Sequence, residues 1–511
     1  MTYLGVDIGT QGVKAGLYDA EGRCRAEAFR KSELHQPAAG VVEEDPEKQL
    51  ASVCECLAEC VGRAAAVGGA PGIAVDGIAI DGQMAGIIGV GADGRCVTPY
   101  DSWLDTRCAP WITHMRREAG AEIVRKTGGP ASFNHGPKVL WWKHERPESF
   151  SRIRAFVQPG GYAAMRLCGM DASHAFIDAS YLHFSGFADA SGPRWDPELC
   201  RVFGIDPGLL PRIVLSHEVI GGMSRGMAAA CGLPSGVPVV AGCGDTAASF
   251  LSCGAAQAGV CADVAGTASV FAATTSAFRP DVEEQILCCG RSATPGLWHP
   301  YAYVAGGGMN LEWFRERFAG DVEGGLDRLN DLAAAVEPDA DDPMFIPHLG
   351  GRVSPSQPDL RGAWVGLAWG HGPGHLYRAV LEGVALEYGL YLRRLESLFG
   401  AGTVRQVRVT GGGEKSVVWN RIKADTLGVP VVQVAGAGGA PRGAALLAAY
   451  GVGAVADLPA AAARWVATGT VTEPDARRVP VARRRIDRYA ELLRMMNRWS
   501  EAGGGAGREK T

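Results

Sequence analysis

The sequence contains one short pattern twice, near its N-terminus and near its middle: two β-prone arms joined by a turn with Gly-Thr. The first copy covers residues 4–18 (LGVDIGTQGVKAGLY), in which Asp7 ends the first arm, and the second covers residues 260–275 (VCADVAGTASVFAATT). Either copy alone is most simply a hairpin turn. Two copies, each opening one half of the chain, predict two similar halves that face one cleft. Backbone N–H groups in such paired turns can bind phosphate from both sides.

A second constraint comes from residues 237–251 (VPVVAGCGDTAASFL), an apolar strand, a glycine-rich turn, Asp245 and a small-residue helix. Gly242 and Gly244 let the chain turn sharply, so we expect Asp245 at the carboxyl end of a strand, where α/β sheets bind ligands. A carboxylate in that place can act as a general base. On this stretch alone, an N-cap for the following helix is the simpler interpretation.

Length and composition narrow the class of protein. A chain of 511 residues is too long for one core and predicts two domains of comparable size, or three. The net charge of −5 gives no basic face, so we expect a small-molecule partner and no nucleic acid. The 14 cysteines lack C-x-x-C pairs and are typical of buried side chains in a reducing compartment. With no signal-peptide pattern and no membrane-spanning apolar run, we expect a cytoplasmic protein without a membrane partner; a homodimer is left open.

Polar residues follow another predicted strand of the first half. Residues 45–66 are predicted to form an amphipathic helix and residues 73–80 a strand. The sequence D-G-Q-M at 81–84 comes directly after that strand, so its side chains are expected at the same sheet edge as Asp7.

Two further segments of the first half carry polar and aromatic residues. Asp105 and Arg107 lie close in sequence, and a surface ion pair is the commoner outcome for such a pair. Residues 133–145 are typical of a loop that enters a helix, whose two tryptophans are expected in the core.

Glycine clusters recur in the second half. Residues 306–308 (GGG) lead into a predicted helix over 309–318, and residues 404–413 (VRQVRVTGGG) form a predicted strand that ends in three glycines before another helix. A triple glycine at a strand end fits a flat ring lying against the backbone, although a plain tight turn is also consistent. Further predicted segments are a glycine-rich helix entry at 436–445, helices at 375–399 and 482–499, the latter with solvated arginines, and a disordered tail at 501–511.

A dinucleotide-binding protein is the main rival interpretation. The pattern G-x-G-x-x-A at 242–247 follows a strand, and Asp263 lies at the distance expected of a ribose-binding acid, which together would indicate an NAD(P)-dependent dehydrogenase. However, Asp245 would then lie beside the pyrophosphate, and Asp7, the two Gly-Thr turns and the triple glycine would have no role. No P-loop motif occurs. An ATP-binding actin-like switch protein would use the turns but not Asp245.

The chain resembles the FGGY carbohydrate kinases, and most closely their xylulokinase branch. The resemblance runs nearly from end to end and is specific because several motifs occur together. These motifs are DIGTQGVK at 7–14, PKVLWWKHE at 137–145, GCGD at 242–245, GAWVGL at 362–367, HLYRAVLEGV at 375–384 and GGG at 411–413.

The resemblance implies an α/β protein of two actin-like (ribonuclease H-like) domains, with mixed sheets and flanking helices, hinged around a central cleft. Residues 1–251 would bind mainly sugar and residues 252–500 mainly ATP. It also implies ATP- and Mg²⁺-dependent transfer of a phosphoryl group to a hydroxyl of a small sugar, a ketopentose such as D-xylulose being the first candidate.

The resemblance further assigns roles to single residues. Asp245 would be the catalytic base, and Asp7 would hold Mg²⁺. The implied ATP-binding residues are Thr10, Gly266, Thr267, Gly308, Glu312, Gly412 and Ser416, and the implied sugar-binding residues are Gln83, Met84, Asp105, Phe133 and Thr246.

Two departures from the family pattern concern the substrate. Xylulokinases usually have Q-M-H-G where this chain has Q-M-A-G at 83–86, so a histidine that could contact the sugar is replaced by Ala85. The usual S-G-E-R-T-P is G-G-R-V-S-P at 350–355. Another ketose or a short polyol therefore stays open as the substrate.

Overall fold

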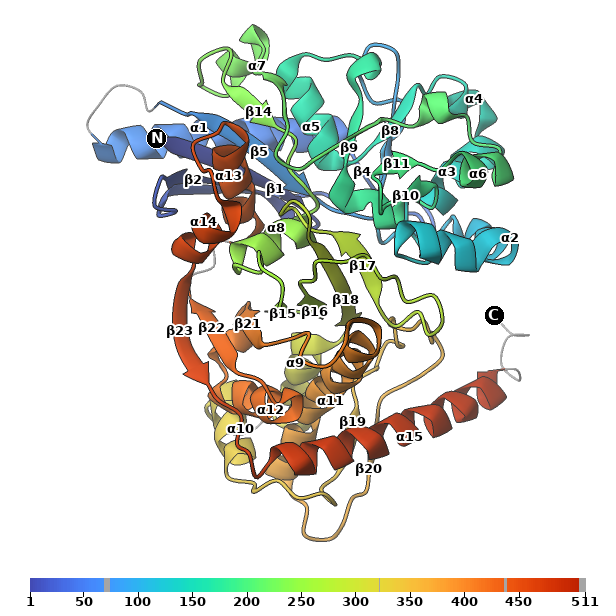
Figure 1. Cartoon of the computed structure of the whole chain (residues 1–511), viewed down its shortest axis with the longest axis vertical. Helices are drawn as coiled ribbons and strands as arrows, with labels where there is room; N and C mark the ends of the chain where they lie inside the picture. Colours follow the sequence, from blue (N-terminus) through green and yellow to red (C-terminus); the bar gives the residue numbers. More distant parts are fainter. Residues whose placement is uncertain (69–73, 321, 436–438, 505–511) are drawn as a thin grey trace.

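The protein consists of two α/β halves, each built on one mixed sheet with flanking helices (Figure 1). The computed structural model describes residues 1–68, 74–320, 322–435 and 439–504. The first sheet has the order β13-β14-β5-β1-β2-β3 and the second has the order β17-β18-β16-β15-β21-β22-β23.

The strands of the two sheets have the following bounds. The first sheet contains β1 (Thr2–Gly9), β2 (Gly12–Asp19), β3 (Cys24–Lys31), β5 (Gly77–Gly82), β13 (Val219–Gly222) and β14 (Pro238–Val240). The second contains β15 (Val260–Ala265), β16 (Ser269–Ala273), β17 (Cys288–Arg291), β18 (Trp298–Val304), β21 (Gln406–Thr410), β22 (Val431–Ala435) and β23 (Ala467–Thr472). Short two-stranded pairs use β4 (Glu43–Glu44), β6 (Ile88–Val90), β7 (Tyr100–Asp101), β8 (Ala155–Val157), β9 (Phe176–Asp178), β10 (Ala188–Asp189), β11 (Arg194–Trp195), β12 (Arg212–Val214), β19 (Met344–Ile346) and β20 (Ala363–Val365).

Helices surround the two sheets, and some of them pack against other helices instead of a sheet face. The first half contains α1 (Pro46–Gly68), α2 (Ala109–Thr127), α3 (His135–Glu145), α4 (Pro147–Phe150), α5 (Pro159–Cys168), α6 (Pro197–Val202), α7 (Arg225–Ala230) and α8 (Asp245–Ser252). The second contains α9 (Gly307–Phe318), α10 (Gly325–Ala334), α11 (Pro373–Phe399), α12 (Val417–Leu427), α13 (Gly439–Gly451), α14 (Leu458–Trp465) and α15 (Val479–Gly504).

The predicted internal repeat is present in the strand pairing. In the first sheet β1 pairs antiparallel with β2 and parallel with β5. In the second sheet β15 pairs antiparallel with β16 and parallel with β21. Each Gly-Thr turn therefore joins the first two strands of its own sheet, and the segments after β5 and after β21 hold equivalent places.

The two halves interlock, because α13 belongs to the second half in sequence but packs on the first sheet (Figure 1). A Cβ added to Gly5 in β1 would lie 1.8 Å from the carbonyl oxygen of Pro441, and one added to Gly443 would lie 2.1 Å from that of Ala248. Glycine at these positions lets the helix approach both β1 and α8 closely. A division of the chain at residue 251 thus describes its order but not its packing.

Most predicted elements are present with shifted ends. The helix predicted over 45–66 is α1, and those predicted over 309–318, 375–399 and 482–499 are α9, α11 and α15. The strand predicted over 73–80 is β5, which begins only at Gly77; residue 73 lies outside the described residues. Of the helix entry predicted at 436–445, residues 436–438 also lie outside them. The tail predicted from 501 is wrong in its start, because α15 continues to Gly504.

Two composition-based expectations can be compared with the structure. All 14 cysteines are free, and most are buried, as expected of small apolar side chains. Within the described residues, no helix is long and apolar enough to span a membrane.

Candidate active site

Three aspartates meet at the carboxyl ends of parallel strands in the first sheet. Asp7 in β1 is the register partner of Asp81 in β5. One bridge further, Gly82 pairs with Gly244, which places Asp245 beside them at the start of α8. The prediction that Asp245 lies at a strand end is confirmed. The carboxyl edge of such a sheet is where ligands bind in open α/β folds.

The turn before Asp245 depends on two glycines. Gly242 has φ of +72°, and a Cβ there would lie 1.9 Å from the carbonyl oxygen of Ile80 in β5. A Cβ on Gly244 would lie 2.5 Å from Cε of Met84. These glycines therefore serve a left-handed turn and a close approach between strands, which brings Asp245 next to Met84.

The N-cap interpretation of Asp245 is wrong. Asp245 is the first residue of α8, and the N-cap is Gly244, which provides no side-chain hydrogen bond. The Asp245 carboxylate instead accepts a hydrogen bond from Oγ1 of Thr246 at 2.9 Å. Because the carboxylate does not cap the helix, its burial beside two other acids needs another explanation.

The three carboxyl groups have strongly altered proton affinities. Burial, followed by the charge of Asp7, raises the pKa of Asp245 to about 7. Burial also raises the pKa of Asp7 to about 6, although the neighbouring Asp81 carboxyl group and the charge of Lys14 oppose this. Burial and the neighbouring charges of Asp7 and Asp245 raise the pKa of Asp81 well above its usual range. Clusters of this kind are typical of functional sites.

The same cluster fits a divalent cation. Oδ1 of Asp7 and both carboxyl oxygens of Asp81 are buried and have no hydrogen-bond partner among the described residues. Within those residues, no group of three or more His, Cys, Asp or Glu side chains is arranged to enclose a metal ion. Mg²⁺ is commonly held by one or two carboxylates together with water and substrate phosphates, and Asp7 with Asp81 could supply that partial set.

Lys14 adds a positive charge that the sequence predictions did not include. It lies directly opposite Asp7 in the β1–β2 pairing, and both residues line a cavity of about 700 Å³ that Gly439 and Pro441 of α13 also border. The signal was present in the sequence: in a hairpin with a two-residue turn, Asp7 and Lys14 are forced to face each other. An ammonium group at this position can neutralise a phosphate.

The second Gly-Thr turn is fixed by the first turn of α9. The backbone N–H of Gly308 donates to the carbonyl oxygen of Gly266 at 2.9 Å, and the N–H of Met309 donates to that of Thr267 at 3.1 Å. A Cβ on Gly308 would lie 2.6 Å from the Gly266 oxygen. Gly308 is therefore a packing glycine of the turn at 266–268, and the two predicted sites form one unit.

Three other residues predicted to bind ATP are Gly412, Ser416 and Glu312, and they differ in their surroundings. A Cβ on Gly411 would lie 2.7 Å from the carbonyl oxygen of Ala265, so the glycines after β21 touch the same loop, and Gly412 is exposed. Ser416 caps α12, because its Oγ accepts the N–H of Trp419 at 3.3 Å. Glu312 is exposed on α9 and pairs with Arg315.

A hydrogen-bonded chain joins the first Gly-Thr turn to the predicted sugar side. Oγ1 of Thr10 accepts from Nε1 of Trp103 at 2.8 Å and donates to Oε1 of Gln83 at 3.3 Å. Nε2 of Gln83 donates in turn to the buried Glu44 at 2.9 Å. Trp103, which remains 46% exposed, was missed because only the acid and the arginine of its segment were considered.

His135 is a further residue that was missed. Its Nε2 donates to the backbone oxygen of Met84 at 2.6 Å, and burial lowers the pKa of the ring to about 4, so the imidazole is neutral at pH 7. Phe133, two positions earlier, is 37% exposed. The only sequence signal was the place of His135 in the segment 133–145, next to a predicted sugar residue.

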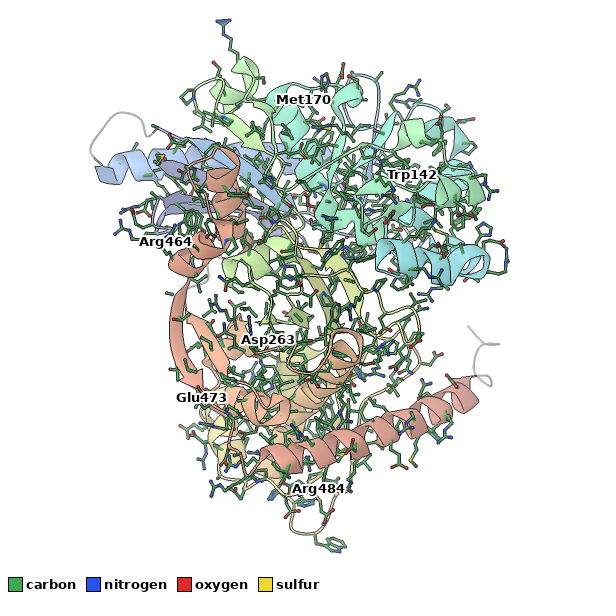
Figure 2. The ribbon with its side chains drawn as sticks, in the orientation of Figure 1. Trp142, Met170, Asp263, Arg464, Glu473 and Arg484 are labelled. Atoms are coloured by element: carbon green, nitrogen blue, oxygen red, sulfur yellow. The ribbon has the colours of Figure 1, made fainter. Side chains whose placement is uncertain are left out.

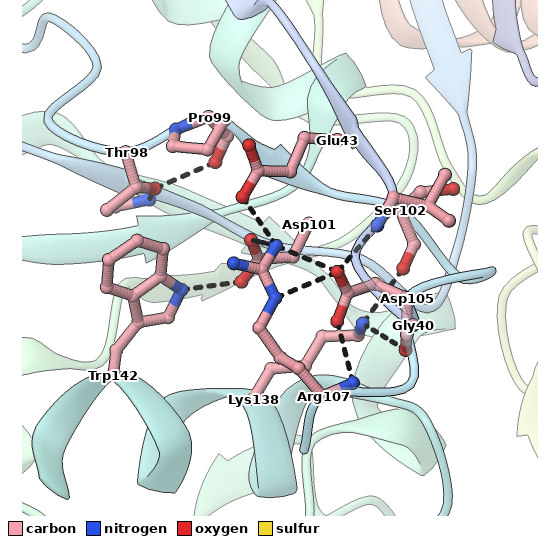
Figure 3. Close-up of polar contacts among 12 residues, drawn as sticks. Gly40, Glu43, Thr98, Pro99, Asp101, Ser102, Asp105, Arg107, Lys138 and Trp142 are labelled. Carbon is pink, nitrogen blue, oxygen red and sulfur yellow. Dashed lines mark hydrogen bonds and ion pairs between the residues drawn. The ribbon is translucent and has the colours of Figure 1, made fainter. Parts of the chain in front are cut away.

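Asp105 and Arg107 do not form the expected surface ion pair but belong to a buried network (Figure 3). Oδ2 of Asp105 accepts from the Val42 N–H and from Nε of Arg107, both at 2.8 Å, and Oδ1 accepts the N–H of Arg107. Arg107 also pairs with Glu43 and Asp101. Both carboxylate oxygens of Asp105 are thus occupied by protein donors, which fits a scaffold better than a sugar ligand.

The predicted tryptophan core is present next to this network (Figure 3). Trp142 is buried, and its Nε1 donates to Oδ2 of Asp101 at 2.5 Å. The guanidinium of Arg107 lies over the ring of Trp141, 4.7 Å from its centre. These rings hold the segment 101–107 rather than stacking on a ligand.

Two related sheets, three aspartates at one sheet edge and a Gly-Thr turn in each half are the arrangement expected of an enzyme that transfers a phosphoryl group. The chain belongs to the FGGY family of carbohydrate kinases: the family's N-terminal domain matches residues 2–252 and its C-terminal domain matches residues 261–452. It is therefore an ATP-dependent phosphotransferase that acts on a sugar hydroxyl, and the two-domain fold implied by the resemblance is confirmed.

Individual proteins similar to this chain include xylulose kinases and gluconokinases. A xylulose kinase of Bacillus subtilis (strain 168) is 26% identical over 494 residues, covering 96% of each chain. A gluconokinase of the same organism is 28% identical over 464 residues, covering 88% of each. The solved structure of xylulose kinase from Rhodospirillum rubrum has a TM-score of 0.90 at 27% identity, covering 98% of this chain and 100% of that one.

The dehydrogenase interpretation is wrong. Besides the family match, Asp263 is not available to a ribose, because it is fully buried in the second half (Figure 2). Its carboxylate is ion-paired with Lys423 and accepts a hydrogen bond from the Tyr388 hydroxyl at 2.7 Å. The glycines at 242 and 244 serve strand packing instead of a pyrophosphate.

Proposed function

We propose that the protein phosphorylates a ketopentose such as D-xylulose, with Asp245 as the general base. The observation that carries this proposal is a half-buried carboxylate with a pKa of about 7 at the sheet edge shared by Asp7 and Asp81. Relatives named xylulose kinase support the ketopentose, whereas those named gluconokinase make gluconate the main competitor. Gln83, Met84, Phe133 and Thr246 are the proposed sugar contacts.

The base is needed because an alcohol is too weak an acid to ionise at neutral pH. As the sugar oxygen bonds to the γ-phosphorus and the bond to the leaving ADP oxygen breaks, Asp245 takes the hydroxyl proton. A pKa near 7 suits this task, since the carboxylate is ionised in a large fraction of molecules and still binds a proton well.

The phosphate groups are held by positioned donors. The N–H groups of the turns at Thr10 and at Gly266–Thr267 are proposed to approach ATP from opposite sides, and Lys14 to neutralise a phosphate oxygen. Mg²⁺, when bound by Asp7, would supply further positive charge for the phosphate oxygens. The glycine segment at 411–413 and Ser416 are proposed to border the rest of the nucleotide.

A coupled ADP-release assay tests the proposed activity. The panel should contain ketopentoses, ketohexoses, polyols and gluconate, each with MgATP. We expect D-xylulose or another ketopentose to give the highest kcat/KM. A clear preference for gluconate or a polyol would overturn the substrate, and the absence of ADP release with every acceptor would overturn the proposed function.

Replacing Gly266 by valine should affect ATP specifically. Gly266 does not require a positive φ, and an added Cβ would have only the carbonyl oxygen of Ala268 near it, at 3.5 Å, so the fold can accept the side chain. The added bulk would instead displace a phosphate from the turn. We expect KM for ATP to rise by about 10-fold or more, the scale of one lost charge-assisted hydrogen bond, while KM for sugar changes little.

Gly226→Val is a matched control for this experiment. Gly226 lies in α7, and no atom is within 4 Å of its added Cβ. This variant should keep both KM values. Equal increases in both KM values for Gly266→Val would assign the turn a purely structural role.

Restoring a histidine at position 85 should change sugar preference. Ala85 is only partly buried and follows Met84 directly, so a larger side chain has room there. We expect Ala85→His to change the ratio of kcat/KM values between sugars by about 10-fold, the scale of one polar contact. Ala92→His, on an exposed loop, provides the control. An unchanged ranking would place Ala85 outside the sugar site.

A further inference from the structure

A second large cavity lies in the second half, away from the three aspartates. Its volume is about 690 Å³, and the C-terminal part of α11 and the middle of α15 form its main walls. Arginines outnumber carboxylates five to two on its lining, the carboxylates being Glu284 and Glu491. The five arginines are Arg352, Arg393, Arg394, Arg494 and Arg498.

Three of these arginines are ion-paired, two of them with buried acids. Arg394 pairs with the buried Asp281 at 2.6 Å, and Arg352 pairs with the buried Glu387 at 3.0 Å. Arg393 pairs with Asp487 at 2.8 Å. Arg352 is 7% exposed, and its Nε is buried without a hydrogen-bond partner in the described part of the chain. The wall therefore presents the guanidinium groups of Arg352 and Arg394 in fixed positions.

The other two arginines have no such anchor. Arg494 and Arg498 lie four residues apart on α15, and no carboxylate of the described residues pairs with either of them. Nε of Arg494 donates only to the carbonyl oxygen of Ala490 in its own helix, at 3.2 Å. Like charges at this helical spacing destabilise each other, so an anion between them would relieve the repulsion.

We propose that this cavity binds a small phosphate-bearing molecule. Guanidinium groups form paired hydrogen bonds to phosphate, and fixed groups lose little freedom on binding. Gln357 and Asn497 add neutral donors, while Ile286, Leu390 and Leu493 offer an apolar surface for a carbon skeleton. The volume is within the range of small-molecule sites. This site does not depend on the proposed sugar.

Calorimetric titration with inorganic pyrophosphate tests the proposal. The whole protein is used with excess ADP, so that the catalytic cleft is already occupied. We expect the parent to bind pyrophosphate and the double variant Arg494→Gln/Arg498→Gln to bind it at least about 10-fold more weakly, as expected when charge-assisted hydrogen bonds are lost. Arg483→Gln/Arg484→Gln is the matched control, because both arginines are exposed on α15 and line no part of the cavity.

Two further measurements separate the possible outcomes. ADP release should be unchanged in the double variant, because neither arginine belongs to the catalytic site. Its thermal unfolding should not shift to a lower temperature, because the change removes a like-charge repulsion. Malonate, a dianion without phosphorus, should bind at least about 10-fold more weakly than pyrophosphate. Failure of the parent to bind pyrophosphate, or equal binding by parent and double variant, would overturn the site. Equal affinity for malonate would overturn its preference for phosphate.

Discussion

Asp245→Asn is expected to lower kcat by about 10² to 10⁴ or more, the range typical for loss of a general base. Asparagine has nearly the same shape and can still contact the sugar hydroxyl, but it cannot take the proton. ATP binding should remain close to that of the parent, because the turns around Thr10 and Thr267 are unchanged. Initial rates and calorimetric ATP binding on the purified variant provide the measurement.

The pH dependence of the parent follows from the same carboxyl group. The base must be ionised to act, so kcat should fall with unit slope as the pH drops below about 7. The pH profile of Asp245→Asn should lack this step. Asp331→Asn, an exposed acid on α10, should retain both the rate and the profile of the parent.

Asp245→Asn should lower kcat but raise the free energy of unfolding. The pKa of Asp245 is about 7 in the folded protein against 3.8 when unfolded, so between these values the folded state holds a proton that the unfolded state has lost. Stability therefore falls as pH rises through this window. At pH 8, Asp245→Asn should raise the free energy of unfolding by about 4 kcal/mol, because the pKa differs by about 3 units between the two states and one unit corresponds to about 1.4 kcal/mol. A folded variant with near-parental turnover would contradict the base, which would then be sought at Asp81.

Much of the fold could be predicted because its signals are local. The Gly-Thr turns, the strand before Gly242 and the glycines after β21 each combine a β-rich run with residues that allow tight turns. Repetition of the first pattern predicted two related sheets, and strand-end aspartates predicted where the site lies. The family motifs then identified the chemistry.

The features that could not be predicted depend on contacts between distant segments. Whether Asp245 caps its helix or faces other acids was decided by the close approach of β5 and β14, which Gly242 permits. The network of Asp105 and Arg107 is covered from α3, because Trp141 packs on the Arg107 guanidinium and Trp142 donates to Asp101, a partner of Arg107. Composition and spacing carry no information on such packing.

The burial and ion pairing of Asp263 could not be predicted from the sequence either. The spacing from the glycines at 242–247 fitted a ribose-binding acid, but the pairing of β15 with β21 and the packing of α11 and α12 place Tyr388 and Lys423 beside it. The charge of the Asp263 carboxylate is therefore neutralised by residues that only the packing of the second half brings next to it.

Lys423→Met is expected to destabilise the protein strongly. Lys423 and Asp263 are both fully buried and ion-paired, and Nζ of Lys423 also lies 4.0 Å from the centre of the Trp419 ring. Methionine has a similar volume but leaves the carboxylate without its counter-charge. Removing one partner of a buried pair typically costs about 3 to 5 kcal/mol, so urea unfolding should show a loss of this size. Lys48→Met, which breaks the exposed pair with Glu33, should unfold close to the parent.

The double variant Asp263→Asn/Lys423→Met distinguishes two causes of the stability loss, the unpaired buried charge and the lost packing of the lysine side chain. Asparagine carries no charge and can still accept the hydrogen bond from Tyr388, so the double variant should recover more than half of the stability lost in Lys423→Met. Asp263 lies in β15, the strand that leads into the turn at 266–268. We therefore expect the KM for ATP of Lys423→Met to be higher than that of the parent. Unchanged unfolding in Lys423→Met would mean that Asp263 does not depend on this partner, and the assignment of Asp263 to the second core would fail.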